Sequence, residues 1–150
     1  MKQLKKAETI YLIKRLNNLV NHHIDELLKE YGMARSQFQV LYLISESGSL
    51  NQKNLLEHMQ IEPATLTGLL DTLEAKRYIR RSLIIKDKRS NIVQLTKSGR
   101  DILRRIPHPG VYVQTVMFNS VSEADRKAFY KIVSHIINNL EHSNGQKIKK

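Results

Sequence analysis

The sequence contains no cysteine and little glycine or proline, with 6 and 3 of them among 150 residues. The absence of cysteine excludes disulfides, thiolate metal sites and thiol redox sensing, and it is typical of a reducing compartment. So few glycines and prolines, beside 41% hydrophobic residues, argue against disorder and favour a helix-rich globule. The length fits one domain or one compact subunit.

Long apolar runs are missing as well. None approaches the roughly 18 residues that a membrane-spanning helix needs. The first residues, MKQLKKAETIYLIKRL, are partly basic but hold no continuous apolar segment, so we expect no signal peptide. The chain is therefore predicted to be cytoplasmic and not associated with a membrane.

Residue patterns of enzymes and metal sites are not found either. His22 and His23 are adjacent and so face different sides of a helix, while His135 and His142 lack the i+4 partner of a helical metal site. No Ser/His/Asp or Cys/His array and no glycine-rich phosphate loop stands out. We expect neither an enzyme nor a bound cofactor or metal.

Positive charge is present in excess, and it is concentrated in one segment. The formal net charge is +11. Residues 76–105 hold eleven Lys or Arg against two Asp, a net of +9, whereas the other 120 residues hold 14 basic and 12 acidic groups, a net of +2. A solvated face would explain the segment. A polyanionic partner would explain it too, because binding to phosphates releases condensed counterions.

Apolar spacing predicts four helices in the first half of the chain. A long helix covers residues 4–31, and a second begins near Ser36, its candidate N-cap. A third helix, capped by its first asparagine, covers residues 51–59, and a fourth with proline in its first turn covers residues 63–76. The tight turn at residues 60–62 makes the last two a helix-turn-helix pattern.

A β-hairpin is predicted directly after this pattern. Residues 81–85 and 91–95 are β-prone, and the polar residues 86–90 connect them. Thr96 is placed to cap a new helix. A hairpin in this position gives a winged helix-turn-helix.

The last third of the chain contains both breaks and a further helix. Pro107 and Pro109 interrupt or kink the helix that begins at Thr96. Residues 111–118 are ambiguous, although their β-branched content favours a strand. Ser122 and the acidic residue three positions later are typical of the start of a helix.

The first and last helices carry broad apolar stripes outside the winged unit. A short chain cannot easily bury both stripes, so we expect a homodimer. The predicted fold class is mainly α with a small β-hairpin wing. Residues 1–34 and 96–145 would form a helical dimerisation region, residues 35–95 a winged helix-turn-helix DNA-binding region and residues 146–150 a basic tail.

Three short motifs make this organisation similar to that of a known family. Residues 87–89 (DKR) match D-x-R, residues 95–99 (LTKSG) match L-T-x-x-G, and residues 73–81 (LEAKRYIRR) match most of L-E-x-x-G-x-I-x-R. In these motifs the chain resembles the MarR family of winged helix-turn-helix transcriptional regulators. Together the motifs are specific, whereas each one alone is weak.

The resemblance implies that the wing reads a minor groove. Arg89 would enter the groove, Asp87 would hold the tip by pairing with an arginine, and Lys86 and Lys88 would meet phosphates. An ordinary turn residue at Asp87 and a solvated charge at Arg89 are the alternatives. The predicted DNA-binding residues are Asn51, Gln52, Lys53, Pro63, Ala64, Thr65, Thr67, Gly68, Arg81, Lys86, Asp87, Lys88 and Arg89.

Two positions depart from the family's pattern. Gly68 stands where the family often has a basic residue, and the segment 60–75 has acidic residues but no Lys or Arg. Base reading would then use Thr65, Thr67 and their neighbours, although these threonines could equally bind phosphate or cap backbone. Arg77 stands where the family usually has a helix-ending glycine, and a left-handed arginine there would cost roughly 1 kcal/mol.

Many members of the family that this chain resembles bind small aromatic or lipophilic effectors in a cleft between the dimer helices and the winged unit. The residues that could line such a cleft here are Tyr11, Arg15, His22, Tyr42 and Arg104. All five are also plausible packing or surface residues. The lack of cysteine excludes the thiol-oxidation branch of the family.

We therefore expect a homodimer that binds double-stranded DNA sequence-specifically and regulates transcription, as a repressor released by a signal. Two other classes stay open. One is an architectural DNA-binding protein with little sequence preference, which the acidic recognition helix favours. The other is a structural dimer module whose basic wing binds an acidic protein.

Overall fold

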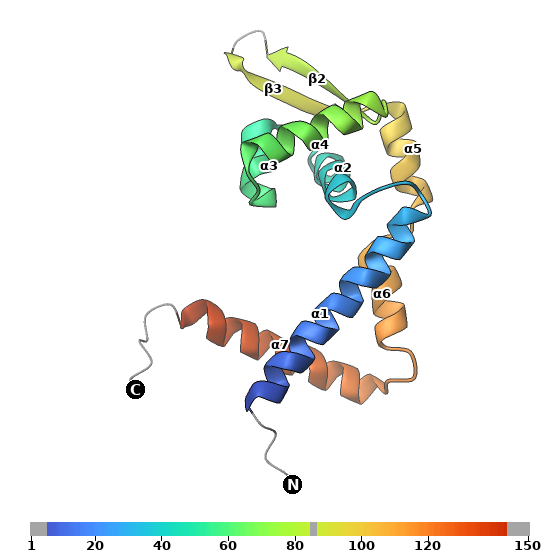
Figure 1. Ribbon diagram of the computed structural model, residues 1–150, viewed down its shortest axis with the longest axis vertical. Helices are drawn as coiled ribbons and strands as arrows, with labels where there is room; N and C mark the ends of the chain where they lie inside the picture. Colours follow the sequence, from blue (N-terminus) through green and yellow to red (C-terminus); the bar gives the residue numbers. More distant parts are fainter. Residues whose placement is uncertain (1–5, 85–86, 144–150) are drawn as a thin grey trace. The chain divides into compact units, whose positions relative to one another are not determined.

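The structure, a computed structural model, describes the backbone of residues 6–84 and 87–143 and the side chains of residues 8–82 and 92–143 (Figure 1). The described residues form two compact units, one up to Val113 and one from Gln114. The elements in chain order are α1 (Lys6–Lys29), α2 (Arg35–Ser47), β1 (Leu50–Asn51), α3 (Gln52–Met59), α4 (Pro63–Ala75), β2 (Ile79–Ile84), β3 (Asp87–Leu95), α5 (Lys97–Arg105), α6 (Pro109–Met117) and α7 (Glu123–His142).

The junction of α1 and α2 is fixed by polar contacts. Gly32 follows α1 in the left-handed conformation, with φ 62°. Arg35 binds Asp25 at 2.7 Å, which ties the start of α2 to α1. The expected N-cap at Ser36 is wrong. The cap is Ala34, which makes no side-chain cap bond. Its backbone N–H donates to the Gln37 side chain at 3.3 Å, which is the half of a capping box that the N3 residue supplies.

The helix-turn-helix consists of α3 and α4, as predicted. The Asn51 side chain caps α3 by accepting from the Asn54 N–H at 2.8 Å. Gln60 ends α3 in the left-handed conformation, and Pro63 opens α4, where its missing N–H costs no intrahelical bond. Leu66, Leu70 and Leu73 turn the inner face of α4 toward the core.

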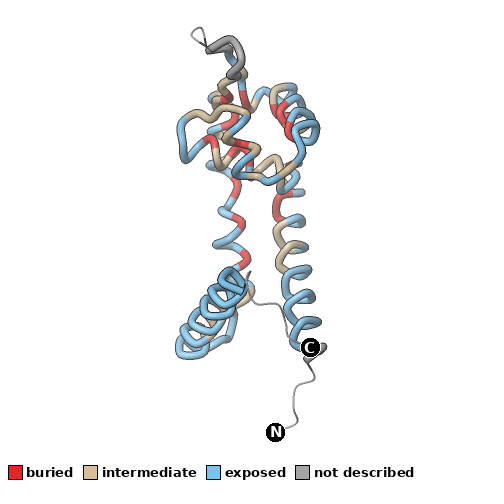
Figure 2. Tube along the Cα trace, turned by 90° about the vertical axis from the view of Figure 1, so that its left-hand side faces the viewer, coloured by how far each residue is buried: buried red, intermediate tan, exposed pale blue. Residues whose placement is uncertain are grey.

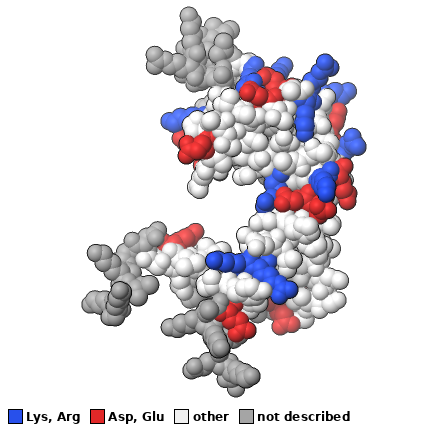
Figure 3. Space-filling model, viewed as in Figure 1, with Lys and Arg blue, Asp and Glu red and all other residues white. Residues whose placement is uncertain are grey.

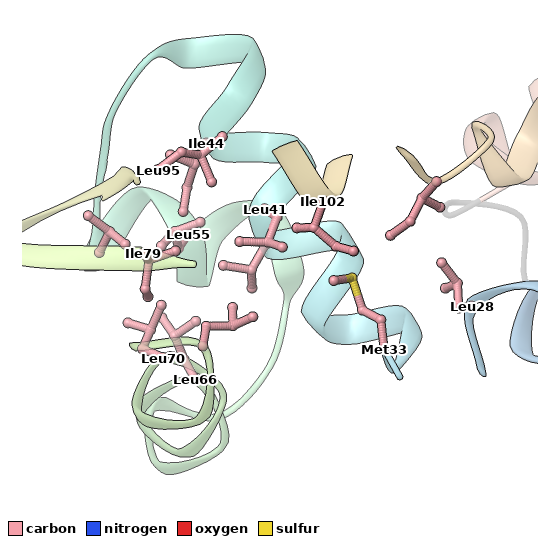
Figure 4. Close-up of a cluster of buried hydrophobic side chains, with 14 residues drawn as sticks. Leu28, Met33, Leu41, Ile44, Leu55, Leu66, Leu70, Ile79, Leu95 and Ile102 are labelled. Carbon is pink, nitrogen blue, oxygen red and sulfur yellow. The ribbon is translucent and has the colours of Figure 1, made fainter. Parts of the chain in front are cut away.

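A single hydrophobic cluster holds the winged unit together (Figure 4). It joins side chains of α1, α2, α3, α4, the sheet and α5, and Figure 4 shows Leu55, Leu70 and Ile79 converging from three of these elements. Each large aliphatic side chain buried there contributes about 1.5–3 kcal/mol of transfer free energy. The fully buried residues of the cluster are Leu28, Val40, Leu41, Ile44, Leu55, Leu70, Leu73, Ile79 and Val93.

The wing is an antiparallel hairpin of β2 and β3, to which β1 adds a short third strand in the order β1-β3-β2. The prediction of a hairpin is confirmed, but the expected connection at residues 86–90 is wrong, because β3 already begins at Asp87. Cross-strand pairing supports extended backbone beyond the β-prone residues. The register shifts between the pairs Leu83–Asn91 and Ile84–Asp87.

The two prolines separate α5 from α6, as expected. Helix α5 ends at Arg105, and Pro109 starts α6 at a position that suits proline. Residues 111–118, which were ambiguous from the sequence with a preference for strand, are mostly helical, since α6 runs from Pro109 to Met117 and buries Val113. Helix initiation by proline and burial of Val113 outweigh the weak β preference of valine.

In the second unit, α7 begins at the predicted serine cap. Ser122 accepts from the Asp125 N–H at 3.1 Å. The Phe118 ring packs against Phe129 and Tyr130 of α7, with centroid distances of 5.5 and 5.8 Å. Helix α7, all of it within the described part of the chain, has no buried residue and is drawn almost entirely as exposed in Figure 2.

Candidate nucleic-acid interface

The corner between α4 and α5 explains the motif L-T-x-x-G. The Thr96 hydroxyl donates to the Arg77 carbonyl at 2.6 Å and accepts from the Gly99 N–H at 3.0 Å. A Cβ at Gly99 would lie only 2.0 Å from the Tyr78 carbonyl oxygen. The absence of a side chain at Gly99 therefore lets α5 pack against the backbone that leads into the wing.

The end of α4 explains the second motif. The Tyr78 N–H bonds back to the Leu73 carbonyl at 2.9 Å, in the pattern of a Schellman cap. Such a cap needs a left-handed residue, and Arg77 supplies it with φ 59°. The arginine thus takes the conformation of the glycine that it replaces and leaves its side chain exposed. Lys76 donates to the Gly32 carbonyl at 2.8 Å and so ties the end of α4 to the junction of α1 and α2.

The Arg81 guanidinium joins the wing to α4. It binds Glu74 through Nε at 2.9 Å and Asp71 through Nη2 at 2.7 Å, while the Glu74 carboxylate also accepts from the Arg81 backbone N–H at 3.1 Å. These hydrogen bonds lower the pKa of Glu74 and raise the pKa of Arg81. Arg81, one of the residues predicted to bind DNA, is thus bound to two carboxylates and fixes the hairpin on α4.

The exposed face of α4 carries small side chains from its first two turns. Pro63, Ala64, Thr65, Thr67 and Gly68 are all exposed, as a groove-reading helix requires. The two threonines differ. The Thr67 hydroxyl donates to the Pro63 carbonyl at 3.0 Å, whereas the Thr65 hydroxyl has no partner among the described side chains and backbone.

Gly68 is not required by the packing of α4. A Cβ built there meets no atom within 4 Å, so an alanine or a longer side chain would fit. Glycine inside an exposed helix costs about 1 kcal/mol relative to alanine. Gly68 leaves this part of the exposed face without a side chain, and no contact among the described residues requires a glycine there.

The other predicted DNA contacts lie around this face. The Asn51 side chain is occupied by its capping bond, and the exposed Lys53 lies 3.9 Å from Glu57. Gln52 is half-buried at the start of α3. The predicted contacts in the wing fall outside what the structure describes, since Lys86 is not described and of Asp87, Lys88 and Arg89 only the backbone is, as part of β3.

The charges of this region are mixed and not uniformly basic. Figure 3 shows Lys and Arg side chains beside Asp and Glu over the winged unit. Arg81 is paired with acids, and Arg80 donates to Gln94 across the hairpin at 3.0 Å. Asp71 was not identified from the sequence as a partner of Arg81. Its spacing of three from Glu74 on α4 was the available signal, because it places both carboxylates on one face.

The expected effector residues are divided between two hollows. Tyr42 and Arg104 line a cavity of about 300 Å³ in the winged unit. Tyr11 and Arg15 line a separate hollow of about 430 Å³ on α1, and His22 lines neither. The full lining of the first cavity is Phe38, Tyr42, Ser45, Leu95, Arg100, Leu103, Arg104, Ile106 and His108.

The described residues contain neither a metal-binding cluster nor a membrane-spanning helix. Across residues 6–84 and 87–143, no three His, Asp or Glu side chains are grouped as a metal site would require. None of the helices in the described ranges combines the length and hydropathy needed to cross a membrane.

Comparison with known proteins assigns the chain to a family. The model of the MarR family matches residues 33–90. The HTH-type transcriptional regulator SarZ of Staphylococcus aureus is 35% identical over 115 residues, which are 77% of this chain and 72% of SarZ. The chain belongs to the MarR family. A second relative, the uncharacterized HTH-type transcriptional regulator YfiV of Bacillus subtilis, is 31% identical over 111 residues, 74% of this chain and 69% of its own.

Solved structures confirm the winged helix-turn-helix fold of this MarR-family chain. A putative MarR-like regulator from Bacillus cereus superposes with a TM-score of 0.80 at 18% identity, over 89% of this chain and 96% of its own. A mutant of E. coli MarR in complex with operator DNA gives a TM-score of 0.74 at 20% identity, over 91% of this chain and 99% of its own. The predicted fold class, mainly helical with a small hairpin wing, is thereby confirmed.

Proposed function

We propose that this MarR-family regulator binds a specific double-stranded DNA site as a homodimer and represses transcription there. The observation that carries the proposal is the exposed face of α4 beside the hairpin, which presents small apolar groups and a Thr65 hydroxyl that has no partner among the described residues. E. coli MarR, a structural neighbour, has been solved with operator DNA, and this precedent supports the same use of the fold.

Recognition would be divided between α4 and the wing. In the major groove, Thr65 and Thr67 can hydrogen-bond base edges, while Ala64 and the threonine methyl groups can contact thymine methyls. In the minor groove, Arg89 would meet the negative potential of a narrow A·T-rich stretch. Phosphate contacts would come from Lys53 and from lysines of the wing.

The homodimer would be formed by the helical regions 1–34 and 96–145, leaving residues 35–95 to bind DNA. The described part of α1 exposes the apolar side chains of Ile10, Ile13 and Leu16, and α7 exposes those of Ile136 and Leu140. Side chains of this size are rarely left in water in such numbers, and a two-fold partner would cover them.

A competition titration on DNA fragments selected from the source genome tests the proposal. Native protein should prefer its selected fragment over random DNA by about 10³ or more. The Thr65→Ala/Thr67→Ala variant should lose much of this preference while keeping its salt dependence, because phosphate contacts outside α4 remain. If native protein and the variant preferred the selected fragment over random DNA to the same degree, these threonines of α4 would not contribute to sequence recognition.

A second candidate, an architectural DNA-binding protein, is favoured by one observation. The recognition helix α4 carries Asp71 and Glu74 but no Lys or Arg, so it adds no attraction to phosphate of its own. In that case native protein would bind all fragments within about tenfold, with a steep salt dependence from the basic segment alone.

An effector that releases the repressor would enter the cavity of Tyr42 and Arg104. The rings of Phe38, Tyr42 and His108 lie 5.2 to 6.4 Å apart at this cavity and Arg100 is also in its lining, so it suits a planar aromatic molecule, above all an acid. DNA binding of Bordetella bronchiseptica BpsR, another structural neighbour, is regulated by 6-hydroxynicotinic acid. Calorimetry with this compound and with Tyr42→Ala as the control tests the site, and equal heats from both proteins would rule it out.

A further inference from the structure

We infer that Asp71 determines base specificity, by accepting a hydrogen bond from the exocyclic amino group of a cytosine in the major groove and by repelling DNA that lacks this donor. The inference rests on the proposed function, since it needs α4 to lie in the groove. It assigns a role to an acidic residue on a helix that faces a polyanion.

Asp71 lies on the exposed face of α4. It follows Thr67 by four residues and Gly68 by three, so the three positions are neighbours on one side of the helix. The side chain of Asp71 is 58% exposed. Because Gly68 presents no side chain and the space above it is open, a base edge can approach this part of α4 closely.

One oxygen of the Asp71 carboxylate is hydrogen-bonded within the chain, and the other is available as an acceptor. Arg81 binds its Oδ1 at 2.7 Å and is itself fixed by Glu74. Oδ2 of Asp71 has no hydrogen-bond partner among the described residues. A carboxylate with one oxygen anchored and one free is an oriented acceptor, and cytosine N4 is the major-groove donor that Asp and Glu read.

The same charge works against non-specific binding. A carboxylate on the face of α4 repels phosphates whatever the base sequence. In addition, Asp71 and Glu74 occupy the Arg81 guanidinium, which would otherwise be free to bind a phosphate. Only a DNA site that places a cytosine amino group at Oδ2 offsets this repulsion. Asp71 would therefore raise the ratio of the affinity for the specific site to the affinity for random DNA, and not the affinity for DNA in general.

The test uses the intact protein, its selected fragment and a set of fragments in which each C·G pair of the half-site is changed singly to T·A. Native protein should lose about tenfold in affinity at one of these pairs, the value of one good base contact. Asp71→Asn should show no loss at that pair and should bind random DNA at least threefold more tightly. Asp101→Asn is the matched control, because it removes an exposed ion pair to Arg104 on α5, and it should behave as native protein.

The outcomes separate this inference from the proposed function. Native preference for the selected fragment, together with native behaviour of Asp71→Asn on all fragments, would overturn the role of Asp71 and leave the function standing. Absence of any native preference would overturn both. Should Asp71→Asn fail to fold, Asp71→Glu keeps the charge but displaces the carboxylate, and it should retain native affinity for random DNA while losing the cytosine preference. A retained cytosine preference in Asp71→Glu would overturn the inference.

Discussion

At the scale of single residues, the contact of Arg81 with two carboxylates of α4 is the feature that joins the wing to the recognition helix. The guanidinium presents separate donors to the two carboxylates, with Nε bound to Glu74 and Nη2 bound to Asp71. The pair with Glu74 is partly exposed, so water screens it and its net contribution is modest.

The first prediction concerns Glu74→Gln. At pH 7 the variant should lose about 1 kcal/mol of the free energy of unfolding, measured by urea denaturation. Because the Arg81 hydrogen bond lowers the folded-state pKa of Glu74, its contribution is present above the ordinary glutamate pKa of about 4.3 and is lost as the pH falls through the lowered pKa. The difference from native protein should therefore shrink in acid. Glu57→Gln, which removes a longer exposed pair to Lys53, is the control and should cost little at either pH.

The second prediction compares two glycines. Gly99→Ala should destabilise the chain by about 3 kcal/mol, since its Cβ would collide with the Tyr78 carbonyl oxygen. Gly68→Ala should stabilise it by about 0.5–1 kcal/mol, because the added methyl meets nothing and alanine favours the helix. Thermal unfolding of the two variants measures both changes. A stabilised Gly99→Ala variant would contradict the packing of α5 on the backbone at Tyr78.

At the scale of elements, the sequence predicts those helix boundaries that depend on nearby residues, such as capping side chains. The caps at Asn51, Thr96 and Ser122 each consist of one side chain bonded to a backbone N–H three residues on, and all three are found as predicted. The start of α2 at Ala34 and the helix α6 were missed. Both depend on contacts that local propensity does not report, namely the bond back from Gln37 and the burial of Val113.

The candidate DNA-binding site could also be predicted only in part. Its face on α4 follows from the apolar spacing of the leucines, which leaves the threonines outward. The sequence could not show that Arg81 binds Asp71 and Glu74, because these contacts depend on how the hairpin packs against α4. It could not show either that the Thr67 hydroxyl bonds to the backbone while the Thr65 hydroxyl finds no partner within the described part of the chain.

The third prediction concerns the wing as an element. Arg89→Ala should weaken DNA binding by about 1–3 kcal/mol if the side chain enters a minor groove. Arg105→Ala, an exposed arginine of the same basic segment on α5, is the matched control and should change the affinity much less. Fluorescence anisotropy at moderate salt measures both, with circular dichroism to show that helicity is kept. Equal affinities of the two variants would exclude the groove contact.

At the scale of the whole molecule, the apolar faces of α1 and α7 predict a dimer in solution. Light scattering on native protein at micromolar concentration should give twice the chain mass of 17.4 kDa. Ile136→Asp should give monomers or unfolded chains, because it would place a carboxylate in the apolar interface without a partner. Gln39→Asp, at an exposed position of α2, is the control and should remain dimeric. A native monomer would contradict the two-fold assembly.

The central claim is that a two-fold dimer of this chain recognises one DNA sequence through α4 and the wing. Quantitative footprinting of native protein on a genome-selected fragment, with random DNA in about 10³-fold excess, tests it most directly. We expect two protected half-sites centred about one helical turn apart and related by two-fold symmetry. Uniform protection along the fragment, or protection abolished by the random competitor, would contradict it.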